Sequence, residues 1–136
     1  IIDEKMSSAF SVHSNWPNNL ATPYIVEASK KLLEKFDSFT SGITATAPGF
    51  YAPQGRELRI KPVIHNLHEK MNTFSFEENR ITNFEMETSA LYFLGKALGH
   101  NTLTICAIIG NRISKTQSKD YKKTVDRLIL SVLEKL

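Results

Sequence analysis

The stretch from Thr102 to Ile109 constrains the fold more than any other part of the chain, because it is a nearly unbroken run of apolar residues. A short run of this kind favours a β-strand, and a strand without polar alternation is typical of a sheet covered on both faces. Sequences that favour helices lie on either side of it, at 88–98 and 118–133. This alternation of helices and strands predicts the α/β class.

The composition excludes several classes of protein. The chain has 136 residues, which suffices for one ordinary domain and not for two, and 41% of them are hydrophobic, as in soluble globular domains. The net charge of +3 is too small, and the charges of 119–127 are too interleaved, to indicate a nucleic-acid surface. Cys106 is the single cysteine, so an internal disulfide is excluded and a reducing compartment is favoured. The longest apolar run, 105–109, is too short to span a membrane.

Periodicity and capping residues predict the remaining elements. Residues 1–21 are polar and irregular, and we expect a strand remnant followed by a loop there. The helix at 88–98, stopped by Gly99, has so little polar surface that it should be largely buried. Thr22 is the expected cap of an earlier helix. The predicted segments are helices at 23–36, 67–74, 88–98 and 118–133, strands at 41–46, 81–86 and 102–109, a short extended piece within 58–64, and a loop at 50–56.

Glu85 and Glu87 stand at the junction between the predicted strand 81–86 and the predicted helix 88–98. Alternation along a strand sends both carboxylates to one side and Met86 to the other. Two carboxylates beside a buried helix are costly unless they are paired or hydrogen-bonded, and the hydroxyl groups of a sugar would satisfy them as donors. The alternative is that Glu87 caps the helix while Glu85 faces water. The residues alone leave both interpretations open.

The loop at 50–56 combines two aromatic rings with an amide and a guanidinium. Phe50 can stack on a base or pack against a sugar. Gln54 offers both an acceptor and donors, whereas Arg56 only donates. Together they can complement the edge of uracil, which reads acceptor, donor, acceptor. On the residues alone, a surface turn with inward-facing rings is the favoured interpretation.

The other candidates carry little chemistry. His65 and His68 lie close in sequence, but no further ligand completes a metal site, so no metal is expected. Cys106 is expected to be a small buried hydrophobe rather than a nucleophile. The sequence contains no P-loop, dinucleotide fingerprint or nucleophile elbow.

Three segments carry a more specific pattern. They are Gly42-Ile43-Thr44-Ala45-Thr46-Ala47-Pro48-Gly49-Phe50-Tyr51-Ala52-Pro53-Gln54-Gly55-Arg56, Asn83-Phe84-Glu85-Met86-Glu87-Thr88-Ser89-Ala90-Leu91 and Ile108-Ile109-Gly110-Asn111-Arg112. In this order they resemble the nucleoside phosphorylases of the uridine phosphorylase type, over nearly all of the chain from about residue 20 onwards. The Glu-Met-Glu segment is shared across the wider phosphorylase and nucleosidase superfamily, and the Phe-Tyr loop with Gln and Arg points to pyrimidine nucleosides. The resemblance implies a three-layer α/β/α fold with a mixed central sheet.

On the base side, the resemblance assigns roles position by position. Phe50 would pack against the bound nucleoside, and Gln54 and Arg56 would bind the uracil edge. Arg112 would lie near the base pocket. Related purine enzymes place an aspartate near the end of the last strand, and the lack of an acid at 109–112 favours a pyrimidine base or a neutral, hydrogen-bonded leaving group.

On the sugar side, the resemblance implies that Glu85, Met86 and Glu87 hold the ribose. Glu87 would accept hydrogen bonds from sugar hydroxyls and Met86 would cover the sugar face. Among all the site residues, Arg56 and Glu87 are the two expected to act catalytically.

The sequence also departs from the family pattern. Pro48-Gly49 stands where many bacterial relatives carry a Ser-Asp type of pair, and nothing matches the family's glycine-rich phosphate loop or its phosphate-binding arginines. We therefore expect residues 1–136 to be the C-terminal part of a single nucleoside phosphorylase domain, truncated at the N-terminus. Such a chain would contact base and ribose with little or no phosphorolysis of its own.

The implied reaction is phosphate-dependent cleavage of a pyrimidine nucleoside to the free base and ribose 1-phosphate, in nucleoside catabolism and salvage. Phosphate is the expected co-substrate, and no cofactor is expected. The resemblance further implies a cytoplasmic homo-oligomer, a dimer or a hexamer, without nucleic-acid or membrane partners. The alternatives are a purine nucleoside phosphorylase or nucleosidase of the same superfamily, and a non-catalytic nucleoside-binding fragment.

Overall fold

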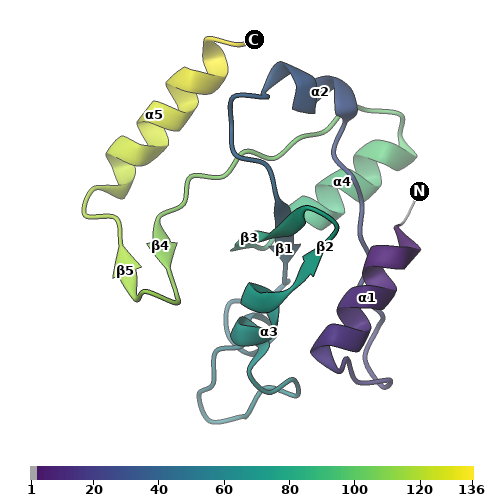
Figure 1. Cartoon of the computed structure of the whole chain (residues 1–136). Helices are drawn as coiled ribbons and strands as arrows, with labels where there is room; N and C mark the ends of the chain where they lie inside the picture. Colours follow the sequence, from purple (N-terminus) through teal and green to yellow (C-terminus); the bar gives the residue numbers. More distant parts are fainter. Residues whose placement is uncertain (1–2) are drawn as a thin grey trace.

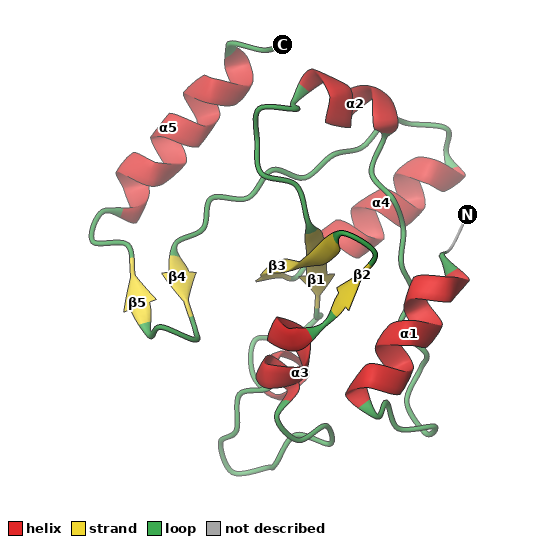
Figure 2. Ribbon diagram, in the orientation of Figure 1, coloured by secondary structure: helices red, strands yellow, loops and turns green. Residues whose placement is uncertain are grey.

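Short strands and helices alternate along residues 3–136, the part of the chain that the computed structural model describes (Figures 1 and 2). The elements are α1 (Glu4–Ser14), α2 (Lys30–Lys35), β1 (Ile43–Thr46), the 3₁₀ turn η1 (Ala52–Gln54), α3 (Leu67–Thr73), β2 (Ser75–Phe76), β3 (Asn79–Glu85), α4 (Thr88–Ala97), β4 (Gly110–Asn111), β5 (Thr116–Gln117) and α5 (Tyr121–Leu133). The predicted strands at 41–46 and 81–86 and the helices at 67–74, 88–98 and 118–133 are confirmed within a few residues.

The larger sheet has the order β1-β3-β2 and is mixed. β1 runs parallel to β3, and β2 runs antiparallel to β3. The register sets Thr46, the last residue of β1, opposite Glu85, the last residue of β3. β4 and β5 form a separate antiparallel pair. The α/β class and the mixed sheet are therefore confirmed.

Residues 4–14 form α1, so the strand remnant expected within 1–21 was wrong there, whereas residues 15–21 are the expected loop and residues 1–2 lie outside the described part. Asp3 caps this helix by accepting a hydrogen bond from the Met6 amide at 3.0 Å. Phe10 is buried and meets the ring of Phe74 edge to face, with centroids 5.1 Å apart. Serines of α1 donate to backbone carbonyls, Ser14 to Phe10 at 2.7 Å within the helix and Ser7 to Pro23 outside it.

The helix predicted at 23–36 is much shorter, since only Lys30–Lys35 are α-helical. Ser29 precedes its first residue, so Thr22 does not cap it. The amide of Ser29 instead donates to the carbonyl of Thr102 at 2.9 Å, and the chain before it is extended. The long-range bond therefore outweighs the helical periodicity of the local sequence.

The segment 102–109 is not a strand in the described part of the chain, which corrects the strongest sequence prediction. It follows α4 as irregular chain, half-buried through residue 107. Its sequence favours a strand, but in residues 3–136 no neighbouring strand pairs with it. The extended piece expected within 58–64 is likewise absent, because this stretch consists of bends and irregular chain.

α4 is not largely buried, contrary to expectation. Leu94 is 57% exposed and Leu98 is 69% exposed, and only Thr88 and Gly95 of this helix are buried. The expected end of the helix is confirmed, because Gly99 has a left-handed φ of 75°. No helix within residues 3–136 is long and apolar enough to cross a membrane.

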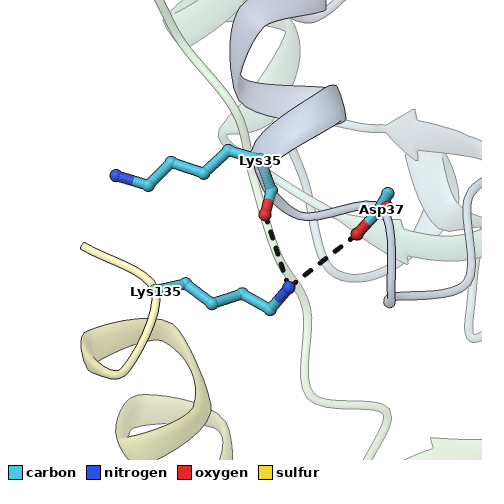
Figure 3. A network of polar contacts seen from close by, with 3 residues as sticks. All are labelled: Lys35, Asp37 and Lys135. Carbon is cyan, nitrogen blue, oxygen red and sulfur yellow. Dashed lines mark hydrogen bonds and ion pairs between the residues drawn. The ribbon is translucent and has the colours of Figure 1, made fainter.

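α5 is held to the rest of the chain by polar contacts at its C-terminal end (Figure 3). The Lys135 ammonium lies 3.8 Å from the Asp37 carboxylate and donates to the carbonyl of Lys35 at 3.4 Å. The Lys35 ammonium donates to the carbonyl of Leu136 at 3.2 Å. No residue of α5 is buried.

Gly95 allows α4 to lie against the start of the 102–109 segment. A β-carbon at Gly95 would overlap Thr102 Cγ2 and sit 3.1 Å from its Oγ1. We predict that Gly95→Ala destabilises the chain by about 1 kcal/mol, because overpacking of about 1–3 kcal/mol outweighs the better helix propensity of alanine. Urea unfolding measures the change.

The double variant Gly95→Ala/Thr102→Ala tests the cause, since it removes the Thr102 atoms that the new methyl group would meet. It should be less destabilised than the sum of the two single variants. Simple additivity would show that the close approach is not the reason.

Candidate active site

The Glu85 carboxylate lies where β3 ends and α4 begins. Its Oε1 accepts a hydrogen bond from the Thr46 hydroxyl across the β1–β3 pair. Its Oε2 accepts from the backbone amides of Glu87 at 2.7 Å and Thr88 at 2.6 Å. These amides belong to the beginning of α4, which is a favourable place for a negative charge.

These contacts determine the charge of Glu85. Burial alone raises the pKa of the Glu85 carboxyl, but bonds from the Thr46 hydroxyl, the Glu87 amide and the hydroxyl and amide of Thr88 together lower it below the ordinary value of 4.5. Glu85 is therefore ionised at neutral pH. Its contribution to stability is present above pH 4.5 and is lost as the pH falls through the lower pKa of the folded state.

Glu87 and Met86 have more open surroundings. Both are exposed, Met86 by 41%. Glu87 is the residue before α4 and its side chain makes no capping bond to the helix, although its Oε2 accepts from the Met86 amide at 3.3 Å. The interpretation in which Glu87 caps the helix and Glu85 faces water is therefore reversed, because Glu85 bonds the first amides and Glu87 faces solvent.

Gln54 holds the two arginines of the predicted base site. Its side chain is buried, and Oε1 accepts from Arg56 Nη1 at 2.7 Å and also from Arg112 Nη2. Arg112 Nη1 donates to the Gln54 carbonyl at 3.0 Å. Because guanidinium groups only donate, the amide oxygen must face both arginines and the amide nitrogen must point the other way.

Phe50 covers this group from the solvent side. The Arg56 guanidinium carbon lies 3.6 Å from the centre of the Phe50 ring, and its Nη1 donates to the Phe50 carbonyl. The Phe50 ring is 53% exposed and meets Tyr51 edge to face at 5.3 Å. The loop is thus ordered by its own side chains, and the surface-turn interpretation with inward-facing rings does not describe it.

Sequence reasoning missed His68 on α3 as part of this cluster. The ring centroids of His68 and Phe84 are 6.2 Å apart, and the Arg112 guanidinium lies 5.1 Å from the centre of the Phe84 ring. Burial and the charges of Arg112 and Arg56 lower the pKa of His68, so the ring is neutral at pH 7. No motif links His68 to the loop, because the position of α3 brings them together.

The arginine pair carries positive charge that the described part of the chain does not neutralise. Burial and the neighbouring Arg56 charge lower the pKa of Arg112. Within residues 3–136 neither guanidinium forms an ion pair, and no cluster of metal-ligating side chains is found. The site can therefore accept electron-rich or anionic groups.

Phe84 and Glu85, neighbours on β3, join the two halves of the site. The first packs beside Arg112, and the second binds Thr46 at the end of β1. Ligands of α/β sheets bind at the carboxyl ends of parallel strands, where these residues lie. The structure thus brings the predicted residues together as two adjacent groups, Phe50, Gln54, Arg56 and Arg112 on one side and Glu85, Met86 and Glu87 on the other.

Cys106 is not placed for nucleophilic chemistry. It is half-buried, and both burial and the Glu85 charge raise the pKa of its thiol. The thiol is therefore protonated at neutral pH.

Comparison with known proteins identifies the family of the chain. The chain is 30% identical over 102 residues to a uridine phosphorylase of Thermococcus kodakarensis, an alignment covering 73% of this chain and 34% of that protein. Its structure is similar to a crystal structure of Trypanosoma brucei nucleoside phosphorylase that shows uridine phosphorylase activity, with a TM-score of 0.65 and 26% identity. That similarity covers 98% of this chain and 40% of the other.

The chain thus spans well under half the length of either relative. A family model described as the phosphorylase superfamily matches residues 2–134, almost the whole sequence. Because this match covers far more than half of the sequence, the chain belongs to the phosphorylase superfamily.

Proposed function

We propose that the protein is a nucleoside phosphorylase of the uridine phosphorylase type, which cleaves a pyrimidine nucleoside with phosphate to give the base and ribose 1-phosphate. The observation that carries the proposal is the buried Gln54 oxygen, which bridges two arginines that form no ion pair within residues 3–136, beside the Glu-Met-Glu junction. The relatives named above support it. The reaction needs no cofactor beyond its co-substrate phosphate.

The base subsite presents donors. Both observed bonds to Gln54 Oε1 come from arginines, so the Gln54 amide nitrogen and the outer N–H groups of Arg56 are the groups left for a ligand. A pyrimidine base with carbonyl oxygens complements them, and Phe50 offers a ring to pack on. When the glycosidic bond breaks, negative charge moves onto the base. Arg56 would stabilise that charge most strongly in the transition state.

The sugar subsite presents acceptors. The exposed Glu87 carboxylate would accept hydrogen bonds from the ribose hydroxyls, and Met86 would cover the sugar face. Positive charge develops on the sugar during cleavage, and the carboxylates of Glu85 and Glu87 lie on this side of the site. The two subsites therefore oppose the two charges that the reaction creates.

Residues 1–136 are proposed to form the C-terminal part of a single phosphorylase domain. Support comes from the relatives, of which the chain covers 34% and 40%. In this proposal the phosphate subsite is built by other parts of the complete protein. That protein would act in nucleoside salvage in the cytoplasm as a homo-oligomer.

The first prediction concerns base choice. Uridine should bind at least about tenfold more tightly than inosine, and Gln54→Ala should weaken uridine binding by about tenfold, since a buried hydrogen-bonding group is lost. Isothermal titration calorimetry measures both. Gln117→Ala, in exposed β5, is the matched control and should bind like the unaltered chain. Equal binding of inosine, or no effect of Gln54→Ala, would favour the purine-enzyme or nucleosidase alternative.

The second prediction concerns the two-point contact of Arg112 with Gln54. Arg112→Lys should weaken uridine binding about ten- to a hundredfold, because an ammonium group cannot reproduce a bond to both the carbonyl and the side-chain oxygen. Arg80→Lys, exposed on β3, is the control. Unchanged affinity in Arg112→Lys would remove Arg112 from the base subsite.

The third prediction concerns turnover. Residues 1–136 alone, given uridine and phosphate, should release little or no ribose 1-phosphate, because the donors that place the phosphate are assigned to other parts of the protein. Chromatographic measurement of ribose 1-phosphate decides this. A turnover rate typical of complete phosphorylases would contradict the proposed domain assignment.

A further inference from the structure

The two carboxylates of the Glu-Met-Glu junction differ in what surrounds them. The Glu85 carboxylate is half-buried and is bonded by the Thr46 hydroxyl and by the amides of Glu87 and Thr88. The Glu87 side chain is exposed and accepts only a long bond, 3.3 Å, from the neighbouring Met86 amide. Most acceptor positions of Glu85 are therefore filled by protein, whereas those of Glu87 are open.

We propose that Glu85 is a positioning residue, anchored by Thr46 and the first amides of α4, which orients the sugar-contacting Glu87 of the proposed function. This division rests on the proposed function, because it assigns separate tasks within the same sugar subsite. It makes Thr46, which the sequence reasoning left without a role, a positioning residue too.

The Thr46 hydroxyl has a fixed direction of donation. Its oxygen accepts from the Ser89 amide at 3.0 Å, so its single proton is available for Glu85 Oε1. One side chain thus ties the end of β1 both to the end of β3 and to the first turn of α4. Valine at this position would lose both bonds, whereas serine would keep both.

Glu85 in turn sets the backbone from which Glu87 projects. The Glu87 amide donates to Glu85 Oε2, so the peptide unit that precedes the Glu87 side chain is held by the anchored carboxylate. Weakening the anchor frees this peptide, and the cost appears as poorer sugar binding without any lost contact to the sugar. Among the described residues, the Cys106 thiol also interacts with Glu85, and it remains neutral.

The anchor is tested without any ligand. The pKa of the Glu85 carboxyl is measured by carbon NMR in the whole chain and in three variants. Glu85 should titrate below an ordinary glutamate in the unaltered chain and in Thr46→Ser, and at a higher pH in Thr46→Val. Thr44→Val is the matched control, because the Thr44 hydroxyl lies on the same strand and donates to Asn83 instead, at 2.8 Å. An ordinary pKa in the unaltered chain, or no change in Thr46→Val, would overturn the anchor.

The division of roles is tested with uridine. Thr46→Val should weaken uridine binding by about tenfold, while Thr46→Ser and Thr44→Val bind like the unaltered chain. Added uridine should shift the carboxyl signal of Glu87 and leave that of Glu85 almost in place. A larger shift at Glu85, or full affinity in Thr46→Val, would overturn the proposal.

Two further outcomes separate the causes of failure. If circular dichroism shows that Thr46→Val does not fold, Glu85→Gln replaces it, because the amide keeps the shape of the side chain but lacks its charge. Glu85→Gln should lose a similar share of uridine affinity. Full uridine affinity in Glu85→Gln would overturn the positioning role of Glu85. If the unaltered chain does not bind uridine, the proposed function and the sugar role of Glu87 both fail. The ligand-free titration still decides the anchor.

Discussion

The parallel pairing of β1 with β3 is the contact on which the rest of the site depends. Its register sets Thr46 opposite Glu85, so two strand ends and the beginning of α4 meet at one edge of the sheet. The loop after β1 then carries Gln54 and Arg56 towards Arg112, which directly follows β4. A shift of this register by one residue would send Glu85 to the opposite face and separate it from the helix amides. The geometry of the site therefore depends on the 4 residues of β1 that pair with β3.

Charge is divided across this edge in a way that suits cleavage of a bond between a base and a sugar. Arginines without ion-pair partners in residues 3–136 lie on one side, and an ionised glutamate lies on the other. Each charge is held by hydrogen bonds that exist before any ligand arrives, so little reorganisation is required when the charges of the substrate separate. His68 fits this picture as a neutral spacer, because a protonated ring beside two guanidinium groups would add a third positive charge.

The sequence predicted best the elements and motifs that are determined by residues close to one another along the chain. Helix α5 and the left-handed turn at Gly99 depend on neighbouring residues, and the motifs that contain Gln54 and Glu85 lie within short stretches. The pattern of β3 also predicted a strand, and this strand forms because β1 and β2 pair with it. The failures involve distant partners. The 102–109 segment has the composition of a central strand, but it needs a neighbouring strand to become one. Residues 23–29 are not helical, because they form contacts with distant segments instead, including the Ser29–Thr102 hydrogen bond. Thr46 and His68 have their roles because of distant partners, Glu85 and Arg112 respectively, so no local sequence pattern predicts these roles.

The attachment of α5 has a consequence for how the chain opens. This helix buries no side chain, and its C-terminal end is tied to α2 by an ion pair and two hydrogen bonds at the surface, contacts that dissolved salt weakens (Figure 3). Its free energy of opening is accordingly set by those few bonds, by the half-buried side chains of Val125, Leu128 and Val132 and by its own helix propensity, and it is lower than the global stability of the fold. The backbone amides of Tyr121–Leu133 would thus exchange with deuterium through local detachment, while Phe10, Phe74 and the sheet stay folded.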